Sequence, residues 1–388
     1  MAVSVDNRPS RMRSALAAVL TASILVPAGY LFYRVWQAND ELRNDTKLEQ
    51  QGVEYLTSLS PLISALAESE SAALRGVTAE PGSVTTAVAR VAAVDQRLGD
   101  VLQTRERWAG LRDKIGRLPG VAGDPQIVFQ AHVEVADLTL ALYSTVRNNS
   151  TLVRDPDNDL SHLQQAVALD LPNTVVQVNR MGDLAMMLAA VSGTATQRAT
   201  QQATLGPQFG AAVQAVNIAV NSLTDNLQAA VDDTNSPTLS GNLVTSLDSF
   251  RRGVESLTRG ANPGGSPVPA AMQTAQTQLQ TSLAGLSGVT LKEMDSLFQD
   301  RLDTLDTERI EALMAAGAAL LLVIGALLVR LTGRRRRHEI APGDAGRGPS
   351  SAMSVHQPGP ESGYGRLIDA PPYGEVESTR RERSGALR

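Results

Sequence analysis

Residues 14–33 read SALAAVLTASILVPAGYLFY, and residues 312–329 read ALMAAGAALLLVIGALLV. Neither stretch contains a charged side chain, and each approaches the length of about 20 residues that a helix needs to cross the apolar core of a bilayer. Between them lie residues 37–309, which carry helical patterning almost throughout. This arrangement predicts two transmembrane helices, at 14–36 and 310–332, joined by a large helical body.

Basic residues flank the two apolar stretches, whereas acidic residues dominate the body. Residues 1–36 and 310–388 each carry a net charge of +3, and residues 37–309 carry −11. Basic segments beside transmembrane helices stay on the cytoplasmic side. We therefore expect a cytoplasmic N-terminus at 1–13, an extracytoplasmic body and a cytoplasmic C-terminus. The preference for Arg over Lys is typical of a GC-rich bacterial genome, so the membrane would be the bacterial inner membrane.

The same charge distribution bears on partners. The lipid bilayer is an expected partner of both apolar stretches. Nucleic acid is not, because the acidic body offers no basic patch to its phosphates.

The first apolar stretch has a second interpretation, as a cleaved signal peptide. Val26, Pro27 and Ala28 before Gly29 loosely fit the small-residue pattern of a cleavage site. However, apolar and aromatic residues continue to Trp36, where a mature secreted chain would become polar. An uncleaved membrane anchor is therefore the preferred interpretation.

Four arginines follow the second apolar stretch: Arg334, Arg335, Arg336 and Arg337. A basic run in this place is typical of a membrane anchor, and it also attracts anionic lipid headgroups, by about 1 kcal/mol per basic residue. The segment 333–388 is rich in Gly, Pro, Ser and Arg. Such a composition buries too little apolar surface to offset the entropy of ordering, so we predict a disordered cytoplasmic tail at 333–388.

Apolar residues within the body recur every three or four positions, which is the spacing of one-faced helices that pack against each other. The clearest runs are 84–118, 239–257 and 279–305. Helix breakers occur at Ser60-Pro61, Glu80-Pro81-Gly82, 119–125, Gly206-Pro207, Ser236-Pro237 and 262–267. No stretch alternates with period two over the length of a strand. We predict an all-α fold: an elongated antiparallel helical bundle, either one long bundle or two stacked four-helix bundles, whose first and last helices continue into the membrane segments.

The chemistry of catalysis is not visible in the sequence. The chain contains no cysteine, which excludes disulfides, zinc–thiolate sites and a cysteine nucleophile. A Ser–His–Asp arrangement with a nucleophile elbow, a P-loop and a paired-carboxylate cleft are also missing. We therefore expect a protein that is not an enzyme and binds no cofactor.

Three aspartates match the first ligand positions of a calcium loop: Asp155, Asp157 and Asp159. The glycine that such a loop requires is replaced by Leu160, and the twelfth position is not a glutamate. The competing interpretation is that Pro156 ends the preceding helix and that Asp157 or Asp159 caps the next one. Asp155 and Asp159 remain candidate ligand-binding residues.

Arg75 is the third candidate, because it lies among apolar residues and can hold an anionic ligand between helices. A salt bridge between helices is the competing interpretation. His132 and His162 are the only histidines of the body and have no second histidine at metal-ligand spacing. We expect both to be structural and predict no metal site.

Residues 149–160 read NSTLVRDPDNDL and are followed by Leu171 and Pro172. This segment resembles one in bacterial transmembrane sensors, namely chemoreceptors, histidine kinases and diguanylate cyclases. There a Ser-Asn-Leu, Leu-Asp-Pro-Asp-Leu-Asp, paired-Tyr, Leu-Pro pattern lies between two membrane helices. Residues 70–76 resemble the second helix of those sensors, and 295–313 resemble their final helix as it enters the membrane.

The resemblance covers roughly residues 15–333 and has clear departures. The asparagine of the sensors is Thr151 here, and their two tyrosines are Ser161 and His162. The linker and signalling domains that follow the second membrane helix in the sensors are replaced by the tail at 333–388.

The resemblance implies the input half of a sensor, working as a homodimer and relaying a signal to a separate cytoplasmic signalling protein. The alternative is a scaffold or structural protein of the cell envelope, a helical stalk that recruits other envelope proteins without sensing.

Overall fold

The computed structural model describes residues 9–77, 81–153, 155, 158–234, 236, 238–261 and 267–335. Every regular element in these ranges is a helix, so the predicted all-α class is confirmed. The elements are α1 (Pro9–Leu74), α2 (Pro81–Leu98), α3 (Arg105–Arg117), the 3₁₀ turn η1 (Leu118–Gly120), α4 (Pro125–Asn149), α5 (Asn158–Gln165), the π turn η2 (Ala166–Asp170), α6 (Leu171–Ala189), α7 (Ala195–Asp233), α8 (Leu239–Ala261) and α9 (Pro269–Arg335).

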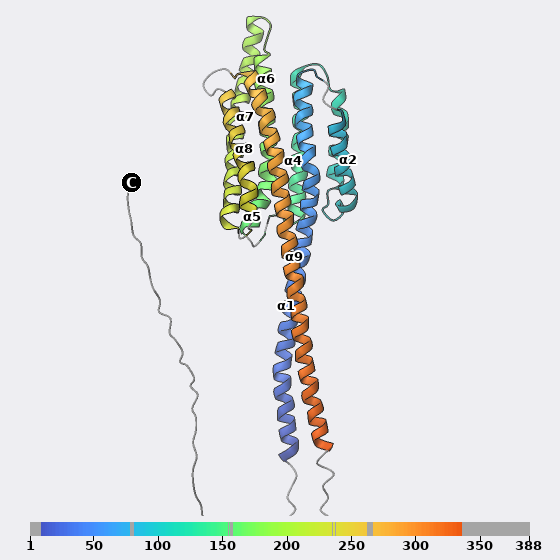
Figure 1. Cartoon of the computed structure of the whole chain (residues 1–388). Helices are drawn as coiled ribbons and strands as arrows, with labels where there is room; N and C mark the ends of the chain where they lie inside the picture. Colours follow the sequence, from blue (N-terminus) through green and yellow to red (C-terminus); the bar gives the residue numbers. More distant parts are fainter. Residues whose placement is uncertain are drawn as a thin grey trace, which may run out of the picture. The chain divides into compact units, whose positions relative to one another are not determined.

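The first and last helices contain the two apolar stretches (Figure 1). Both α1 and α9 are long and apolar enough to cross a membrane, and their most apolar parts are not covered by other described residues. Leu321 and Leu322, for example, are 70% and 76% exposed. Contiguous apolar surface of this kind needs lipid or another apolar partner. The chain thus has the two candidate membrane-spanning helices expected of a two-pass membrane protein.

The helices of the body enclose one continuous hydrophobic core. It extends from Val53 on α1 to Phe298 on α9, and its largest fully buried side chains include Tyr55 and Phe250. Helix α1 contacts α2, α4 and α6, while α7 contacts α5, α6 and α8. Each buried Leu, Val or Phe contributes roughly 1.5–3 kcal/mol to stability. Of the two arrangements left open by the sequence, the continuous core favours one bundle. Residues up to Ile324 form one compact unit. A second unit begins at Gly325, and its described part, Gly325–Arg335, is the last part of α9.

Two of the predicted helix breakers are wrong. Pro61 lies inside α1 and Pro207 lies inside α7. A proline in a helix leaves the carbonyl four residues earlier without its hydrogen bond. Those carbonyls belong to Thr57, which lines an open groove, and to Ala203, which is exposed. Water can hydrogen-bond to both carbonyls. The free-energy cost of each proline is therefore small, and both long helices continue past it.

The apolar run at 84–118 is not one helix either, because it divides into α2 and α3. The intervening turn is held by the buried carboxylate of Asp95, which accepts hydrogen bonds from the Thr104 hydroxyl at 2.6 Å and the Tyr55 hydroxyl at 2.9 Å. The backbone of Gln103 has a φ of 52°, which no helix contains. Apolar spacing continues across the turn because both helices face the same core.

The other breaks occur where the sequence places them. Asp124 caps α4 by accepting a hydrogen bond from the Gln126 backbone N–H at 2.9 Å, with Pro125 in the first turn. Several predictions lie outside the described residues, namely those for Pro156, Asp157, Arg336, Arg337, the linker residues 262–266 and the tail from 336 onward. Arg334 and Arg335 lie in the last turn of α9, but their side chains are also outside the description.

Within the segment that resembles bacterial sensors, residues 150–153 form a tight turn after α4. Thr151 has a φ of 60°, and the side chain of Leu152 is fully buried. Left-handed backbone is strained for a β-branched residue, whereas asparagine tolerates it. Further along, Pro172 is the second residue of α6, directly after the π turn, where a missing N–H is tolerated in the first helical turn.

Replacing Thr151 with asparagine is therefore expected to stabilise the protein by about 1 kcal/mol, because the strain at φ 60° is relieved. Denaturant unfolding of the purified full chain measures the change. Thr200→Asn is the matched control, since Thr200 is an exposed residue within α7 and the same substitution there relieves no strain. An equal effect at both positions would contradict the explanation.

Candidate functional site

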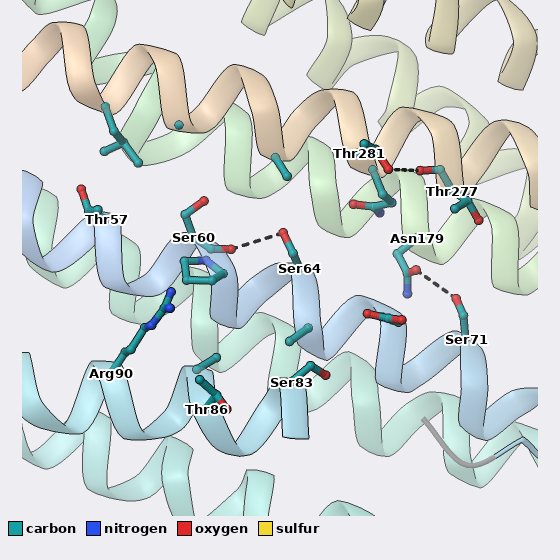
Figure 2. Close-up of a pocket in the computed structure, with 18 of the residues that line it drawn as sticks. Thr57, Ser60, Ser64, Ser71, Ser83, Thr86, Arg90, Asn179, Thr277 and Thr281 are labelled. Carbon is teal, nitrogen blue, oxygen red and sulfur yellow. Dashed lines mark hydrogen bonds between the residues drawn. The ribbon is translucent and has the colours of Figure 1, made fainter. Parts of the chain in front are cut away.

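A groove of about 1280 Å³ runs between α1, α2 and α9, with α6 contributing to its floor (Figure 2). Its lining is rich in hydroxyl groups: Thr57, Ser60, Ser64, Ser71, Ser83, Thr86, Thr277 and Thr281. Four carboxamides join them: Asn179, Gln273, Gln276 and Gln280. Among the described lining residues there is no aromatic side chain. Such a surface offers many hydrogen-bond donors and acceptors beside apolar patches such as Val53 and Leu291, so it can hold a polar solute.

Helical periodicity places these side chains on one surface. On α1 the lining residues recur every three or four positions, and α2 and α9 show the same spacing. Each of the three helices therefore carries a polar stripe beside the apolar stripe that it buries in the core. In the sequence these serines and threonines are indistinguishable from ordinary exposed helix positions, which is why the groove was not predicted.

Arg75 lies at the rim of this groove. It follows the last turn of α1, is exposed, and forms no ion pair with any described carboxylate. The other charged groups that line the groove are the bases Arg90 and Lys292 and the carboxylates of Glu54, Glu68 and Asp295. No ion pair of Arg75 within 4 Å is observed among the described residues, although its charge acts on the buried Asp183 of α6. Its role as a ligand-binding residue stays a prediction.

A buried polar network closes the floor of the groove, and we call it the floor network: Glu70, Ser71, Asn179, Asp183 and Gln276. The amide nitrogen of Asn179 donates to carboxylate oxygens of both Glu70 and Asp183, at 2.9 Å each. Ser71 donates to Asp183 at 2.8 Å, and Gln276 donates to Asn179 at 2.9 Å. The network joins α1, α6 and α9 directly behind the groove.

The two carboxyl groups of the floor network are both buried and lie within reach of one amide. Burial raises the pKa of Asp183 to about 7 and raises that of Glu70 well above its usual range, where the Asp183 charge adds to the effect. Two like charges this close in a poorly hydrated interior repel each other strongly. The pair therefore binds a proton more tightly than two separate, solvated carboxyl groups would.

A second buried cluster surrounds Arg301 of α9, and we call it the Arg301 cluster: Glu49, Asp155, Gln164 and Arg301. The guanidinium of Arg301 donates to both oxygens of Asp155, at 2.7 and 2.9 Å. Its contact with Glu49 is longer, at 3.5 Å. The carboxamide of Gln164 donates to Asp155 at 3.2 Å and to Glu49 at 3.3 Å. Asp155 thus ties the turn between α4 and α5 to the helix that leads toward the membrane.

The other aspartate candidate also has protein partners. Asp159 lies in the first turn of α5, where it accepts hydrogen bonds from the Leu160 backbone N–H at 2.8 Å and from the Thr234 hydroxyl at 2.9 Å. Within the described ranges no group of three or more acidic or histidine side chains is arranged to hold a metal ion. The structure brings neither Asp155 nor Asp159 to the groove.

The two histidines of the body lie apart from each other and from the groove. His132 is buried, with Nδ1 3.0 Å from the carbonyl oxygen of Val128, and its burial lowers its pKa. His162 is half-buried, with Nδ1 3.1 Å from the side-chain oxygen of Asn226. Both contacts lie within the helical packing.

Below the body, α1 and α9 are joined by a set of polar contacts that we call the membrane-side contacts. Arg43 donates to the two carboxylate oxygens of Asp306, at 2.7 and 3.2 Å. Arg309 lies 3.8 Å from Asp40, and its guanidinium carbon lies 4.1 Å from the ring centroid of Trp36. Together these contacts hold the two helices beside each other where the apolar stretches begin (Figure 1).

Comparison of the chain with protein-family models, with curated proteins and with solved structures finds no match. The groove and the two buried carboxylate clusters are the features on which a function can be argued. Both clusters join residues far apart in the chain, and α1 and α9 contribute to each.

Proposed function

We propose that this protein is the input module of a bacterial inner-membrane sensor. Its body, outside the cytoplasm, binds a polar solute in the groove and passes the resulting helix displacement to a separate cytoplasmic partner. The observation that carries the proposal is that the groove is lined by α1 and α9, the two helices that contain the candidate membrane spans. A solute in the groove contacts both of them.

The contacts around the groove give this proposal a physical route. Beneath the groove, the hydroxyl oxygens of Ser60 on α1 and Ser287 on α9 lie 2.9 Å apart. A ligand shifts an equilibrium only by its difference in affinity for two arrangements. A solute that hydrogen-bonds to α1 and α9 together favours one relative position of the two helices. The membrane-side contacts then carry that position toward the membrane.

The resemblance to bacterial sensors supports the same function, since it assigns the chain between its membrane helices to signal input. The acidic body between basic flanks supports the proposed orientation, with both termini in the cytoplasm. The partner that reads the displacement is expected to be a cytoplasmic signalling protein.

Blocking the groove tests the proposal. Gly288 of α9 lines the groove and has open space where a Cβ would lie, so Gly288→Phe adds a bulky side chain beside the groove at a position where its Cβ meets no neighbour. We expect the full chain to gain thermal stability with at least one compound of a polar metabolite panel, because a ligand at 100 times its Kd adds about 2.7 kcal/mol of stability. Gly288→Phe should abolish that gain.

Gly285→Phe is the matched control, because Gly285 lies on the same helix, also faces open space and does not line the groove. This variant should respond like the natural protein. If no compound of the panel stabilises the natural protein and crosslinking recovers envelope proteins, the sensor function is wrong and the envelope scaffold is the better interpretation.

A further inference from the structure

We propose that Glu49 is a proton-binding site whose ionisation controls how firmly Asp155 holds Arg301 of α9. The site lies in the Arg301 cluster, away from the groove, and makes protons a second input to the module. Only the relay of this change toward the membrane rests on the proposed function, because proton binding itself needs no ligand in the groove.

In this cluster the negative charge of Glu49 is compensated less well than that of Asp155. Arg301 donates from two of its guanidinium nitrogens to Asp155, at 2.7 and 2.9 Å, but its distance to Glu49 is 3.5 Å. Glu49 also receives a 3.3 Å hydrogen bond from Gln164, which is shared with Asp155. The side chains of Glu49 and Asp155 are only 6% and 0% exposed, so water does little to offset their charges.

The charged groups around Glu49 come from three elements. Asp45 on α1 and Asp155 in the turn before α5 are negative, and Arg301 on α9 is positive. Burial of Glu49 and then the charge of Asp155 raise its pKa to about 8, against the opposing effects of Arg301 and Gln164. Glu49 is therefore protonated at neutral pH and becomes charged as the solution turns mildly alkaline.

Ionisation of Glu49 changes what Arg301 can bind. A neutral Glu49 leaves the guanidinium to Asp155, whereas a charged Glu49 competes for it. Because Asp155 comes two residues after the turn at 150–153, a weaker Asp155–Arg301 pair loosens this part of the chain from α9. The membrane-side contact of Arg43 with Asp306 lies only a few residues further along α1 and α9, so the change occurs next to the route proposed for the signal.

The floor network also contains two buried carboxyl groups, but they do not share one guanidinium. Glu70 and Asp183 are joined through the amide of Asn179, and the nearby positive charges are Arg180 for Glu70 and Arg75 for Asp183. In the Arg301 cluster, by contrast, two buried carboxylates lie within 3.5 Å of the same guanidinium.

The absence of cysteine makes the test direct, because single labels can be introduced without background. Spin labels at Val153→Cys, in the turn, and Thr304→Cys, on α9, occupy two exposed positions on either side of the Asp155–Arg301 pair. In the full chain in lipid nanodiscs, we expect the distance distribution between them to change from pH 6 to pH 9.5 with a midpoint near pH 8. Glu49→Gln should keep the pH 6 distribution at every pH.

Glu41→Gln is the matched control, since Glu41 is an exposed glutamate of the same helix, and it should leave the transition unchanged. The proposal is overturned if the natural protein shows no change between pH 6 and pH 9.5, or if Glu49→Gln retains the same midpoint. Should Glu49→Gln fail to fold, the uncharged Glu49→Leu gives the same readout. If no polar solute stabilises the natural protein, the groove proposal is wrong, but the pH-dependent change in distance is unaffected.

Stability provides a second measurement with a defined sign. The folded protein binds the Glu49 proton more tightly than the unfolded chain, so this contribution is complete at acidic pH and is lost as pH rises toward about 8. Other buried carboxyl groups act in the same direction. The fall in Tm between pH 5 and pH 9 should therefore be smaller in Glu49→Gln than in the natural protein, and an identical fall would count against the site.

Discussion

Replacing Arg301 with methionine is expected to lower the free energy of unfolding by about 3–5 kcal/mol at neutral pH. Methionine keeps most of the volume of the arginine stem but removes the guanidinium that Asp155 binds through two oxygens. The side chain of Asp155 is fully buried, so its charge would remain without that compensation. Denaturant unfolding of the full chain in detergent measures the loss.

An exposed arginine supplies the comparison. Arg259 on α8 lies 4.0 Å from Glu255, and the two side chains are 78% and 71% exposed, so Arg259→Met should cost less than 1 kcal/mol. Combining Arg301→Met with Asp155→Asn should recover a large part of the loss, because the second change removes the buried charge. Equal costs at Arg301 and Arg259 would show that the cluster does not hold the turn to α9.

The fold class was predictable because its signals are local. Helical spacing of apolar residues and helix breaks depend on neighbours within a few positions, and the break predicted at 119–125 does separate α3 from α4. Prolines are harder, because their cost depends on whether water reaches the freed carbonyl. For Pro61 and Pro207 that depends on an open groove and an exposed helix face, which exist only in the folded chain.

The site was far less predictable, because its residues meet across long sequence separations. Asp155 and Arg301 are 146 positions apart, and Gln164 and Glu49 are 115 apart. Without knowledge of the packing, an aspartate in an Asp-x-Asp-x-Asp pattern suggests a metal ligand or a helix cap. The structure instead makes Asp155 one half of an ion pair.

The segment resembling bacterial sensors contacts both end helices of the chain. Its Ser150 and Leu152 pack on α1, and its Asp155 binds α9. The turn between α4 and α5 is thereby attached to both helices that contain the candidate membrane spans. A residue pattern in such a place constrains the relative position of α1 and α9, whichever solute the groove binds.

The close contact between this turn and α1 leads to the second large effect, at Gly52. A Cβ added there would lie 2.5 Å from the Cβ of Ser150 and 2.9 Å from a methyl carbon of Leu152. Both neighbours are fully buried and cannot move aside freely. We expect Gly52→Ala to destabilise the full chain by about 1–3 kcal/mol, which is the usual cost of overpacking, despite the higher helix propensity of alanine.

The same substitution at Gly285 should have the opposite sign. Gly285 lies within α9 and has open space around the added Cβ, so Gly285→Ala gains up to about 1 kcal/mol of helix propensity with no steric cost. The difference between the two variants in denaturant unfolding then measures how tightly the turn is pressed onto α1. If Gly52→Ala were as stabilising as Gly285→Ala, the turn would not be seated on α1, and the attachment that links the Asp155 segment to both end helices would be lost.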